Sequence, residues 1–391
     1  MQEAMDSVHV FISAGEPSGD LHGSNLIGSL KQLDSTITFS GLGGERMIAA
    51  GITPLVHVKD LSVVGLLKVA ERFFDLSHYL DLVRRHFMKN RPDVVVLIDF
   101  PGFNWWVATR AREFGIPVIY FVPPQLWAWG GWRVAKMKKL IDKVLCNFEF
   151  EKQWFHARGV NAELVGHPYF DELINRQIDT DLVHAIKSKG SPVIGILPGS
   201  RGQELHQNLG SQLQAATIIH KKFPSAHFHV ACLHQRHADL VREKTRSESL
   251  AEIPITIHSG TTKEVISASD CTISVSGSVS LELLQAAVPS VILYQASRPM
   301  IVLAKWLMKC RFISLPNLIA DTELFPEFVN HKPLGTELAG TICDWLINPQ
   351  KLEQSRQNLI NLWNSISKPG ACDRAARQVV HLGTTRKRKA S

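Results

Sequence analysis

Short, continuous apolar runs that alternate with amphipathic stretches constrain the fold of this chain more than any other feature. Such runs are typical of strands buried on both faces, as in a parallel sheet that helices cover. The alternation starts near the N-terminus and restarts at VIGIL. The sequence therefore predicts an α/β protein made of two Rossmann-like halves. The expected strands are 8–12, 94–98, 117–121, 144–147 and 163–165 in the first half, and 193–197, 227–231, 255–258, 271–275 and 290–294 in the second.

The length of 391 residues fits two domains, because a typical domain has about 150 residues. We expect one Rossmann-like domain over 1–175 and a second over 176–345. Residues 346–382 are expected to form helices that pack on the first domain or on a partner subunit. The basic end, 383–391, has nothing apolar to bury and is expected to be disordered.

The composition is that of a soluble globular protein, with 45% apolar and 20% charged residues. No stretch has the roughly 18 consecutive apolar residues of a transmembrane helix, and the N-terminus lacks the pattern of a signal peptide. We therefore expect a cytoplasmic location. The six cysteines form no CxxC pair, which predicts reduced, buried thiols. Four charges of the net +7 lie in 386–389, which argues against binding of nucleic acid by the body of the protein.

The segment SAGEPSGDLHG is a glycine-rich turn between the first expected strand and a helix. Glycines permit tight turning and close approach of a ligand, and N–H groups at a helix start attract anions and hydroxyl groups. Glu16 and Asp20 add carboxylates at the sheet edge where open α/β proteins bind ligands. The alternatives are ordinary turn geometry for the glycines and a first-turn helix charge for Asp20. The candidate ligand-binding residues of this turn are Gly15, Ser18, Gly19 and Asp20.

Asp99 follows the apolar run 94–98 and opens the turn DFPGFN. A carboxylate at the mouth of a sheet has apolar walls, which raise its pKa and suit it to general-base catalysis. Asn104, in the same motif, is a candidate for orienting a ligand. The alternative is that Asp99 only caps the turn that follows it.

Two polar turns and a proline-containing loop in the second half are candidates for binding a nucleotide diphosphate. LPGSRG offers a glycine, a hydroxyl group and Arg201 beside backbone N–H groups. SVSGSVSLELL opens a helix, and its Glu282 is placed to accept hydrogen bonds from ribose hydroxyls. Asn317 lies in SLPNLIA, and these segments together with Asp99 fit a cleft between two domains. The candidate residues of the second half are Gly199, Ser200, Arg201, Ser276, Gly277, Ser278, Glu282 and Asn317.

Seven segments occur in the order and spacing of the lipid-A-disaccharide synthase family: SAGEPSGDLHG, GLGGERM, DFPGFN, VPPQLWAW, LPGSRGQEL, SGSVSLELL and SLPNLIA. The chain resembles this family over 8–375. The resemblance implies the GT-B glycosyltransferase fold, with an acceptor- and membrane-facing N-terminal domain and a C-terminal domain that binds the UDP-sugar. It also implies inverting transfer of diacylglucosamine from UDP-2,3-diacylglucosamine to 2,3-diacylglucosamine 1-phosphate. The products are the β-1′,6-linked disaccharide of lipid A and UDP.

The family's motifs also imply roles for the matching residues. Asp99 matches the aspartate favoured as general base, and Glu16 matches the rival carboxylate. Arg201 and Asn317 match residues that are functionally important in the family. The turn and helix that look like a UDP cradle are matched by Ser276, Gly277, Ser278 and Glu282.

No metal or other cofactor is expected. The segment 179–181 has the shape of a metal-binding DxD motif, but it lies at the expected linker, where a helix N-cap is the better interpretation. The histidines and the cysteine of 227–237 have neither HExxH nor zinc-finger spacing, and we interpret them as strand and loop residues. Arg201, helix N-termini and turn amides are instead expected to neutralise the phosphates.

A membrane contact is expected, because the substrates that the resemblance implies carry acyl chains. The segment 61–74 is apolar over more than one helical face, and basic residues at 84–91 and 133–139 and the tryptophans of 127–132 accompany it. These features predict peripheral binding to an anionic surface, and the resemblance implies that this surface is the inner face of the inner membrane. The alternative is that 61–74 is buried between the sheet and a neighbouring helix. A homodimer is one option for the quaternary structure.

Two alternatives from other classes stay open. A UDP-sugar epimerase can share the GT-B fold, but it has no need for the apolar segment 61–74. A non-catalytic basic module for lipid or RNA would carry its charge in an aromatic-rich motif, whereas here the charge is concentrated in the tail.

Overall fold

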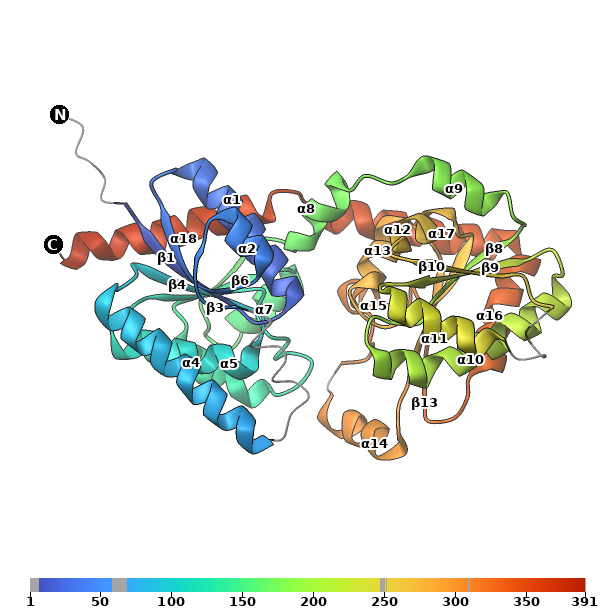
Figure 1. Cartoon of the computed structure of the whole chain (residues 1–391), viewed down its shortest axis with the longest axis horizontal. Coiled ribbons are helices and arrows are strands. Elements are labelled where there is room, and N and C mark those ends of the chain that lie inside the picture. Colours follow the sequence, from blue (N-terminus) through green and yellow to red (C-terminus); the bar gives the residue numbers. More distant parts are fainter. Residues whose placement is uncertain (1–6, 58–68, 247–249, 251, 309, 391) are drawn as a thin grey trace. The chain divides into compact units, whose positions relative to one another are not determined.

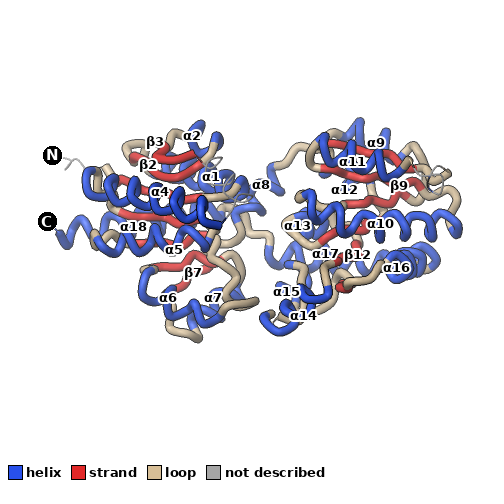
Figure 2. Tube along the Cα trace, turned by 60° about the horizontal axis from the view of Figure 1, so that its bottom comes forward, coloured by secondary structure: helices blue, strands red, loops and turns tan. Residues whose placement is uncertain are grey.

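The computed structural model describes the chain except for residues 1–6, 58–68, 247–249, 251, 309 and 391, and except for the side chains of 69–76, 303–305 and 386–390. The apolar segment 61–74, which was expected to contact a membrane, therefore lies outside the described residues apart from the backbone of its last turns. The chain forms two compact units, each built on one parallel sheet with helices on both faces (Figures 1 and 2). The first comprises 1–174 and 368–391, and the second 175–367.

The first unit has a seven-stranded parallel sheet in the order β3-β2-β1-β4-β5-β6-β7. Successive strand residues point to opposite faces. Phe11 and Val95 therefore join the core beneath α4, α5 and α6, whereas Val10 and Val96 join the core beneath α1 and α18. The strands are β1 His9–Ala14, β2 Thr38–Gly43, β3 Thr53–His57, β4 Val94–Ile98, β5 Val118–Phe121, β6 Lys143–Cys146 and β7 Ala162–Leu164. The helices are α1 Pro17–Leu33, α2 Glu45–Ala50, α4 Val69–Lys89, α5 Pro101–Glu113, η1 Gly131–Arg133, α6 Val134–Leu140, α7 Glu149–His156, α8 Pro168–Asn175 and α18 Ala371–Ala390.

The second unit has a six-stranded parallel sheet in the order β10-β9-β8-β11-β12-β13. Helices α10, α11 and α16 pack on one face, where Leu209, Val241 and Ile342 join Phe228 and Val230 of β9 in one core. The strands are β8 Val193–Leu197, β9 His227–Cys232, β10 Ile255–Ser259, β11 Cys271–Val275, β12 Ser290–Gln295 and β13 Glu327–Asn330. The helices are α9 Thr180–Lys187, α10 Gly202–Lys222, α11 Gln235–Thr245, α12 Thr262–Ala268, α13 Val279–Gln285, α14 Arg298–Leu307, α15 Leu315–Ala320, α16 Gly335–Ile347 and α17 Pro349–Ile366.

The predicted α/β class with two Rossmann-like sheets is confirmed, and all ten expected strands are present. Sequence analysis missed β2, β3 and β13. Strand β2 contains Gly41, and glycine has low strand propensity. Glycine is required at this position, because a Cβ would lie 1.9 Å from the carbonyl oxygen of Ile12. Strand β3 contains Pro54, which a strand at the edge of a sheet accommodates.

The C-terminal helices differ from the prediction in two ways. The expected helical block 346–382 is divided, because α17 belongs to the second unit whereas α18 packs along α1 in the first. Asp171 stabilises the start of α18, because its carboxylate accepts a hydrogen bond from the backbone N–H of Gly370 at 2.6 Å. The prediction of disorder over 383–391 is wrong up to Ala390, where α18 ends. Lysine and arginine are good helix formers, and their charges suit the negative end of the helix dipole.

Candidate active site

Strand β4 ends in a strained turn that carries Asp99. Asp99 and Phe100 have φ values of 47° and 46°, in the left-handed region that non-glycine residues seldom occupy. The carbonyl oxygen of Asp99 accepts hydrogen bonds from the Tyr120 hydroxyl at 2.8 Å and from the Asn104 amide at 2.7 Å. The side chains of Tyr120 and Asn104 thus hold a strained backbone in place, and such strain is typical of turns at functional sites.

Asn104 supports this turn, and its contact with a ligand stays a prediction. The residue is fully buried. Its Nδ2 also donates to the carbonyl oxygen of Ile98 at 3.2 Å, and its Oδ1 accepts a hydrogen bond from the Ser13 hydroxyl at 2.7 Å. Because these bonds join the ends of β1 and β4, Asn104 is a positioning residue for Asp99.

The two candidate bases, Glu16 and Asp99, lie together at the carboxyl edge of the first sheet, because β1 and β4 are hydrogen-bonded neighbours. Gly15 permits this approach, since a Cβ at this position would lie 2.1 Å from the ring of Phe100. Burial raises the pKa of Asp99, and the negative charge of Glu16 raises it further, against the opposing effect of the Phe100 N–H. A half-buried carboxylate with a raised pKa is suited to accept a proton from a hydroxyl group.

Asp20 caps a helix, and its part in binding a ligand stays a prediction. Its Oδ1 accepts hydrogen bonds from the backbone N–H groups of Gly44 at 2.6 Å and Met47 at 3.1 Å, and its Oδ2 accepts one from Arg46 at 3.1 Å. These bonds satisfy the start of α2 and join the motif SAGEPSGDLHG to GLGGERM. The other residues of the turn stay predicted ligand contacts: Gly15, Ser18 and Gly19.

Arg201 is the N-cap residue of α10 in the second unit, at the end of the turn that follows β8. Gly199 in this turn has a φ of 111°, which favours glycine. The Arg201 side chain is well exposed, and its Nη1 lies 3.0 Å from Oε1 of Glu204. Ser200 is also exposed. An exposed guanidinium at the start of a long helix can bind a phosphate.

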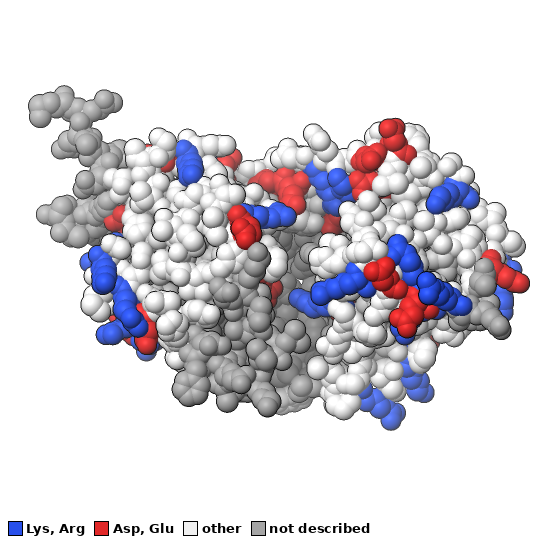
Figure 3. Space-filling view, in the orientation of Figure 1, with Lys and Arg blue, Asp and Glu red and all other residues white. Residues whose placement is uncertain are grey.

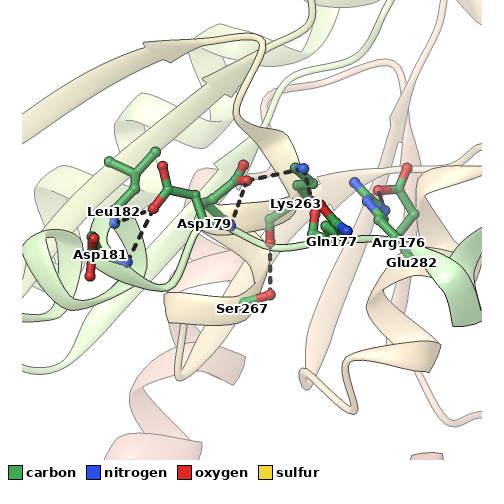
Figure 4. A network of polar contacts seen from close by, with 9 residues as sticks. Arg176, Gln177, Asp179, Asp181, Leu182, Lys263, Ser267 and Glu282 are labelled. Atoms are coloured by element: carbon green, nitrogen blue, oxygen red, sulfur yellow. Dashed lines mark hydrogen bonds and ion pairs between the residues drawn. The ribbon is translucent and has the colours of Figure 1, made fainter.

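Glu282 lies in α13, behind the exposed corner of Gly277 and Ser278. Its Oε2 lies 2.6 Å from Nη1 of Arg176, and the two side chains are only 13% and 21% exposed (Figure 4). A ribose contact therefore requires this oxygen to exchange partners or the other oxygen to be used. Sequence analysis missed Arg176, because it lies in the connection before α9 without any motif around it.

Asn317 is fully buried and holds the SLPNLIA loop, and its direct action on a substrate stays a prediction. Its Oδ1 accepts hydrogen bonds from the backbone N–H groups of 324–325, and its Nδ2 donates to Oε1 of Glu327 at 2.8 Å. Glu327 also accepts a hydrogen bond from the N–H of Ile313, whose carbonyl oxygen accepts one from the Ser276 hydroxyl at 3.0 Å. Asn317 thus supports the turn after β11 indirectly.

A buried carboxylate that sequence analysis did not identify holds the VPPQLWAW loop. Glu151 in α7 accepts hydrogen bonds from Nε1 of Trp127 at 3.1 Å and from the backbone N–H of Asn147 at 2.9 Å. Burial raises the pKa of Glu151 to about 7, against the lowering effect of these hydrogen bonds. The signal in the sequence was its place at the third position of a helix, which is typical of a capping glutamate.

Within the described ranges, no group of three His, Cys, Asp or Glu side chains could hold a metal ion. Asp179 is the N-cap of α9 and accepts hydrogen bonds at Oδ1 from the N–H groups of Asp181 and Leu182, both at 3.1 Å, which confirms the N-cap interpretation (Figure 4). In the histidine-rich region, Nδ1 of His229 on β9 contacts Nε2 of His258 on β10 at 2.9 Å.

Solved structures indicate the class of protein. A MurG structure from Acinetobacter baumannii aligns with a TM-score of 0.59 at 12% identity, over 96% of this chain and 100% of that one. A putative UDP-N-acetylglucosamine 2-epimerase from Listeria monocytogenes aligns with a TM-score of 0.65 at 13% identity, over 95% of each chain. At these identities the likeness shows the fold alone, which is that of the GT-B glycosyltransferases.

Sequence comparison then identifies the family. The model described as lipid-A-disaccharide synthetase matches residues 10–379. Lipid-A-disaccharide synthases from Coxiella burnetii and Geobacter metallireducens are each 31% identical, over 97% and 95% of this chain and 99% and 97% of theirs. The chain therefore belongs to the lipid-A-disaccharide synthase family, which confirms the resemblance. It is a glycosyltransferase of lipid A disaccharide synthesis, acting on a nucleotide sugar and a lipid acceptor. The likeness to epimerases is one of fold only.

Proposed function

We propose that this enzyme condenses UDP-2,3-diacylglucosamine with 2,3-diacylglucosamine 1-phosphate and that Asp99 is the general base. Asp99 takes the proton of the acceptor's 6-hydroxyl group while the oxygen attacks the anomeric carbon of the donor. The bond from that carbon to the diphosphate oxygen breaks, and UDP leaves with the electron pair. Attack from the side opposite UDP inverts the configuration at the anomeric carbon.

The pair of carboxylates at the ends of β1 and β4 carries this proposal. Asp99 is desolvated and held in a strained turn, and its pKa is raised by burial and by Glu16. Glu16 is the N-cap residue of α1, where the helix dipole stabilises a negative charge. The negative charge of Glu16 raises the pKa of Asp99 and makes it more basic. We therefore assign the proton acceptor to Asp99, and Glu16 adjusts its basicity.

On the donor side, we assign neutralisation of the diphosphate to Arg201 and to the turns after β8 and β11. Ser200, Gly277 and Ser278 are exposed in these turns and offer hydroxyl and backbone N–H groups. Donors of this kind stabilise a leaving phosphate without a metal. Turnover is therefore expected to persist in excess chelator, and a loss that a divalent ion restores would contradict the assignment.

The general base is tested by replacing single carboxylates with amides. Asp99→Asn removes the proton acceptor and is expected to lower kcat about a thousandfold. Glu16→Gln keeps the base and is expected to retain most of the turnover. Asp239→Asn changes an exposed residue of α11 and is the matched control. The measurement is formation of disaccharide and UDP from detergent-dispersed substrates. Normal turnover in Asp99→Asn together with loss in Glu16→Gln would transfer the role to Glu16.

We also propose that the enzyme binds peripherally to the anionic inner face of the inner membrane. Trp129 and Trp132 are exposed in the first unit, and the guanidinium of Arg133 lies 4.2 Å from the ring centroid of Trp129. Exposed tryptophan beside cations suits a membrane interface. Among the described helices, none combines the length and apolar character needed to cross a bilayer. The homodimer stays a prediction.

A further inference from the structure

Helix α14 exposes apolar side chains that the proposed mechanism does not use. Val302 and Trp306 are 68% and 80% exposed, and their spacing of four residues places them on the same face of the helix. Met300 of the same helix is exposed as well. In Figure 1, α14 stands apart from the helices that cover the second sheet. Soluble monomers seldom expose large apolar side chains in one group, and such groups mark interaction sites.

The sheet edge that contacts α14 exposes two further apolar side chains. Strand β13 is the last strand of the second sheet and contacts α14. Val329 of β13 is the register neighbour of Tyr294 in β12, and both side chains are exposed. We call these five side chains the α14 surface: Tyr294, Met300, Val302, Trp306 and Val329.

Cations accompany the α14 surface. The segment 294–320 contains four lysines and arginines and no aspartate or glutamate. Arg298 begins α14 and Lys332 follows β13, and both are exposed. They lie near His331, whose pKa is lowered by loss of solvation and by these two positive charges. In Figure 3, the lower end of the second unit, where Figure 1 draws α14, shows uncharged surface beside cationic side chains.

We propose that the α14 surface is a membrane-contact site and that its partner is an anionic lipid bilayer. Apolar side chains of a short amphipathic helix enter the boundary between headgroups and acyl chains, while flanking cations meet lipid phosphates. A symmetric contact with a second copy would bring the same cations face to face, which is unfavourable. The inference rests on the proposed membrane location, and it adds a contact in the second unit to the exposed tryptophans of the first.

The test is co-sedimentation of the full chain with substrate-free vesicles of phosphatidylethanolamine and phosphatidylglycerol. The double variant Val302→Ser/Trp306→Ser is expected to lower the partition coefficient about tenfold, because two apolar side chains no longer leave water. Arg298→Gln is expected to lower it about fivefold on these vesicles and to leave binding to phosphatidylcholine unchanged. Ile347→Ser changes a side chain of α16 that is 63% exposed and is the matched control, with no expected effect.

Two further measurements separate the explanations. Turnover with detergent-dispersed substrates is expected to be unchanged in these variants, because the α14 surface contributes nothing to catalysis. Absence of turnover in the unaltered chain would overturn the proposed function and leave the vesicle result standing. Unchanged partition of the double variant would overturn the membrane assignment. Unchanged partition together with loss of a dimer in light scattering would assign the surface to a second copy instead.

Discussion

The two units present their candidate residues in opposite ways. In the first unit, Asp99 is desolvated and fixed in a strained turn by two buried side chains. In the second unit, the charged candidates are held in ion pairs, with Arg201 paired to Glu204 and Glu282 paired to Arg176. In the first unit, the pKa of Asp99 is therefore raised by its surroundings. In the second unit, the charges of Arg201 and Glu282 are each balanced by an opposite charge.

This difference follows from the chemistry that we assign to each unit. A general base works best when its pKa is set before the reaction, and desolvation achieves this. Glu282 is largely buried and needs a partner, because a desolvated charge without one is costly, whereas Arg201 is exposed, where a phosphate can reach it. We therefore expect substitutions in the first unit to change the rate and its pH dependence, and substitutions in the second to change phosphate stabilisation and folding stability.

Arg201→Ala is expected to have the largest effect among the tests of this contrast. The variant loses a donor to the leaving diphosphate, so kcat is expected to fall about a hundredfold, or roughly 3 kcal/mol of transition-state stabilisation. The free energy of unfolding is expected to change little, because the pair with Glu204 is exposed on the arginine side. Arg242→Ala, in an exposed pair with Asp239, is the control. An unchanged kcat would mean that the phosphates are neutralised elsewhere.

Arg176→Gln is expected to have an intermediate effect, this time on stability. It leaves the largely buried carboxylate of Glu282 without this partner, so we expect urea unfolding of the second unit to show a loss of about 2 kcal/mol. The double variant Arg176→Gln/Glu282→Gln is expected to recover most of the loss. Lys351→Gln, which breaks an exposed pair with Asp344, is the control and is expected to cost under about 1 kcal/mol. Equal losses in the single and double variants would show that the pair is not coupled.

The sheets were predictable because their signal is local. Each buried strand carries its apolar run within five or six residues, and neighbouring helices carry a separate periodicity. Strand β2 was not predicted because Gly41 has low strand propensity, and its close approach to Ile12 in β1 arises only when the two strands pair. The end of the chain was misjudged for a related reason: its charges indicate solvation, whereas the helix that they extend is anchored by the packing of α18 on α1.

The candidate site was predictable only in part. Sequence position placed Glu16, Asp99 and Arg201 in the turns that follow strands, where they are found. Sequence position did not distinguish side chains that face solvent from side chains whose polar atoms are hydrogen-bonded or ion-paired to residues distant in the sequence. Asn104 bonds to a hydroxyl 91 residues away. Glu282 pairs with a side chain 106 residues away. The tertiary structure brings such partners together, and no local sequence pattern predicts them.

The smallest effect that we expect concerns the pH dependence set by the carboxylate pair. Asp99 must be ionised to accept a proton, so kcat/KM rises as the pH increases through its pKa. Burial and the charge of Glu16 both raise that pKa. Glu16→Gln removes the charge and keeps the burial, so the acid limb of the profile is expected to move to lower pH and to stay above the ordinary range of an aspartate. Glu149→Gln, at an exposed position of α7, is expected to leave the acid limb of the profile in place.

If the Glu16→Gln profile did not move, the charge of Glu16 would have no influence on the base. If Glu16→Gln lost turnover at every pH, Glu16 itself would be the base. The proton acceptor of the first unit would then lie at the start of α1 and not in the strained turn after β4.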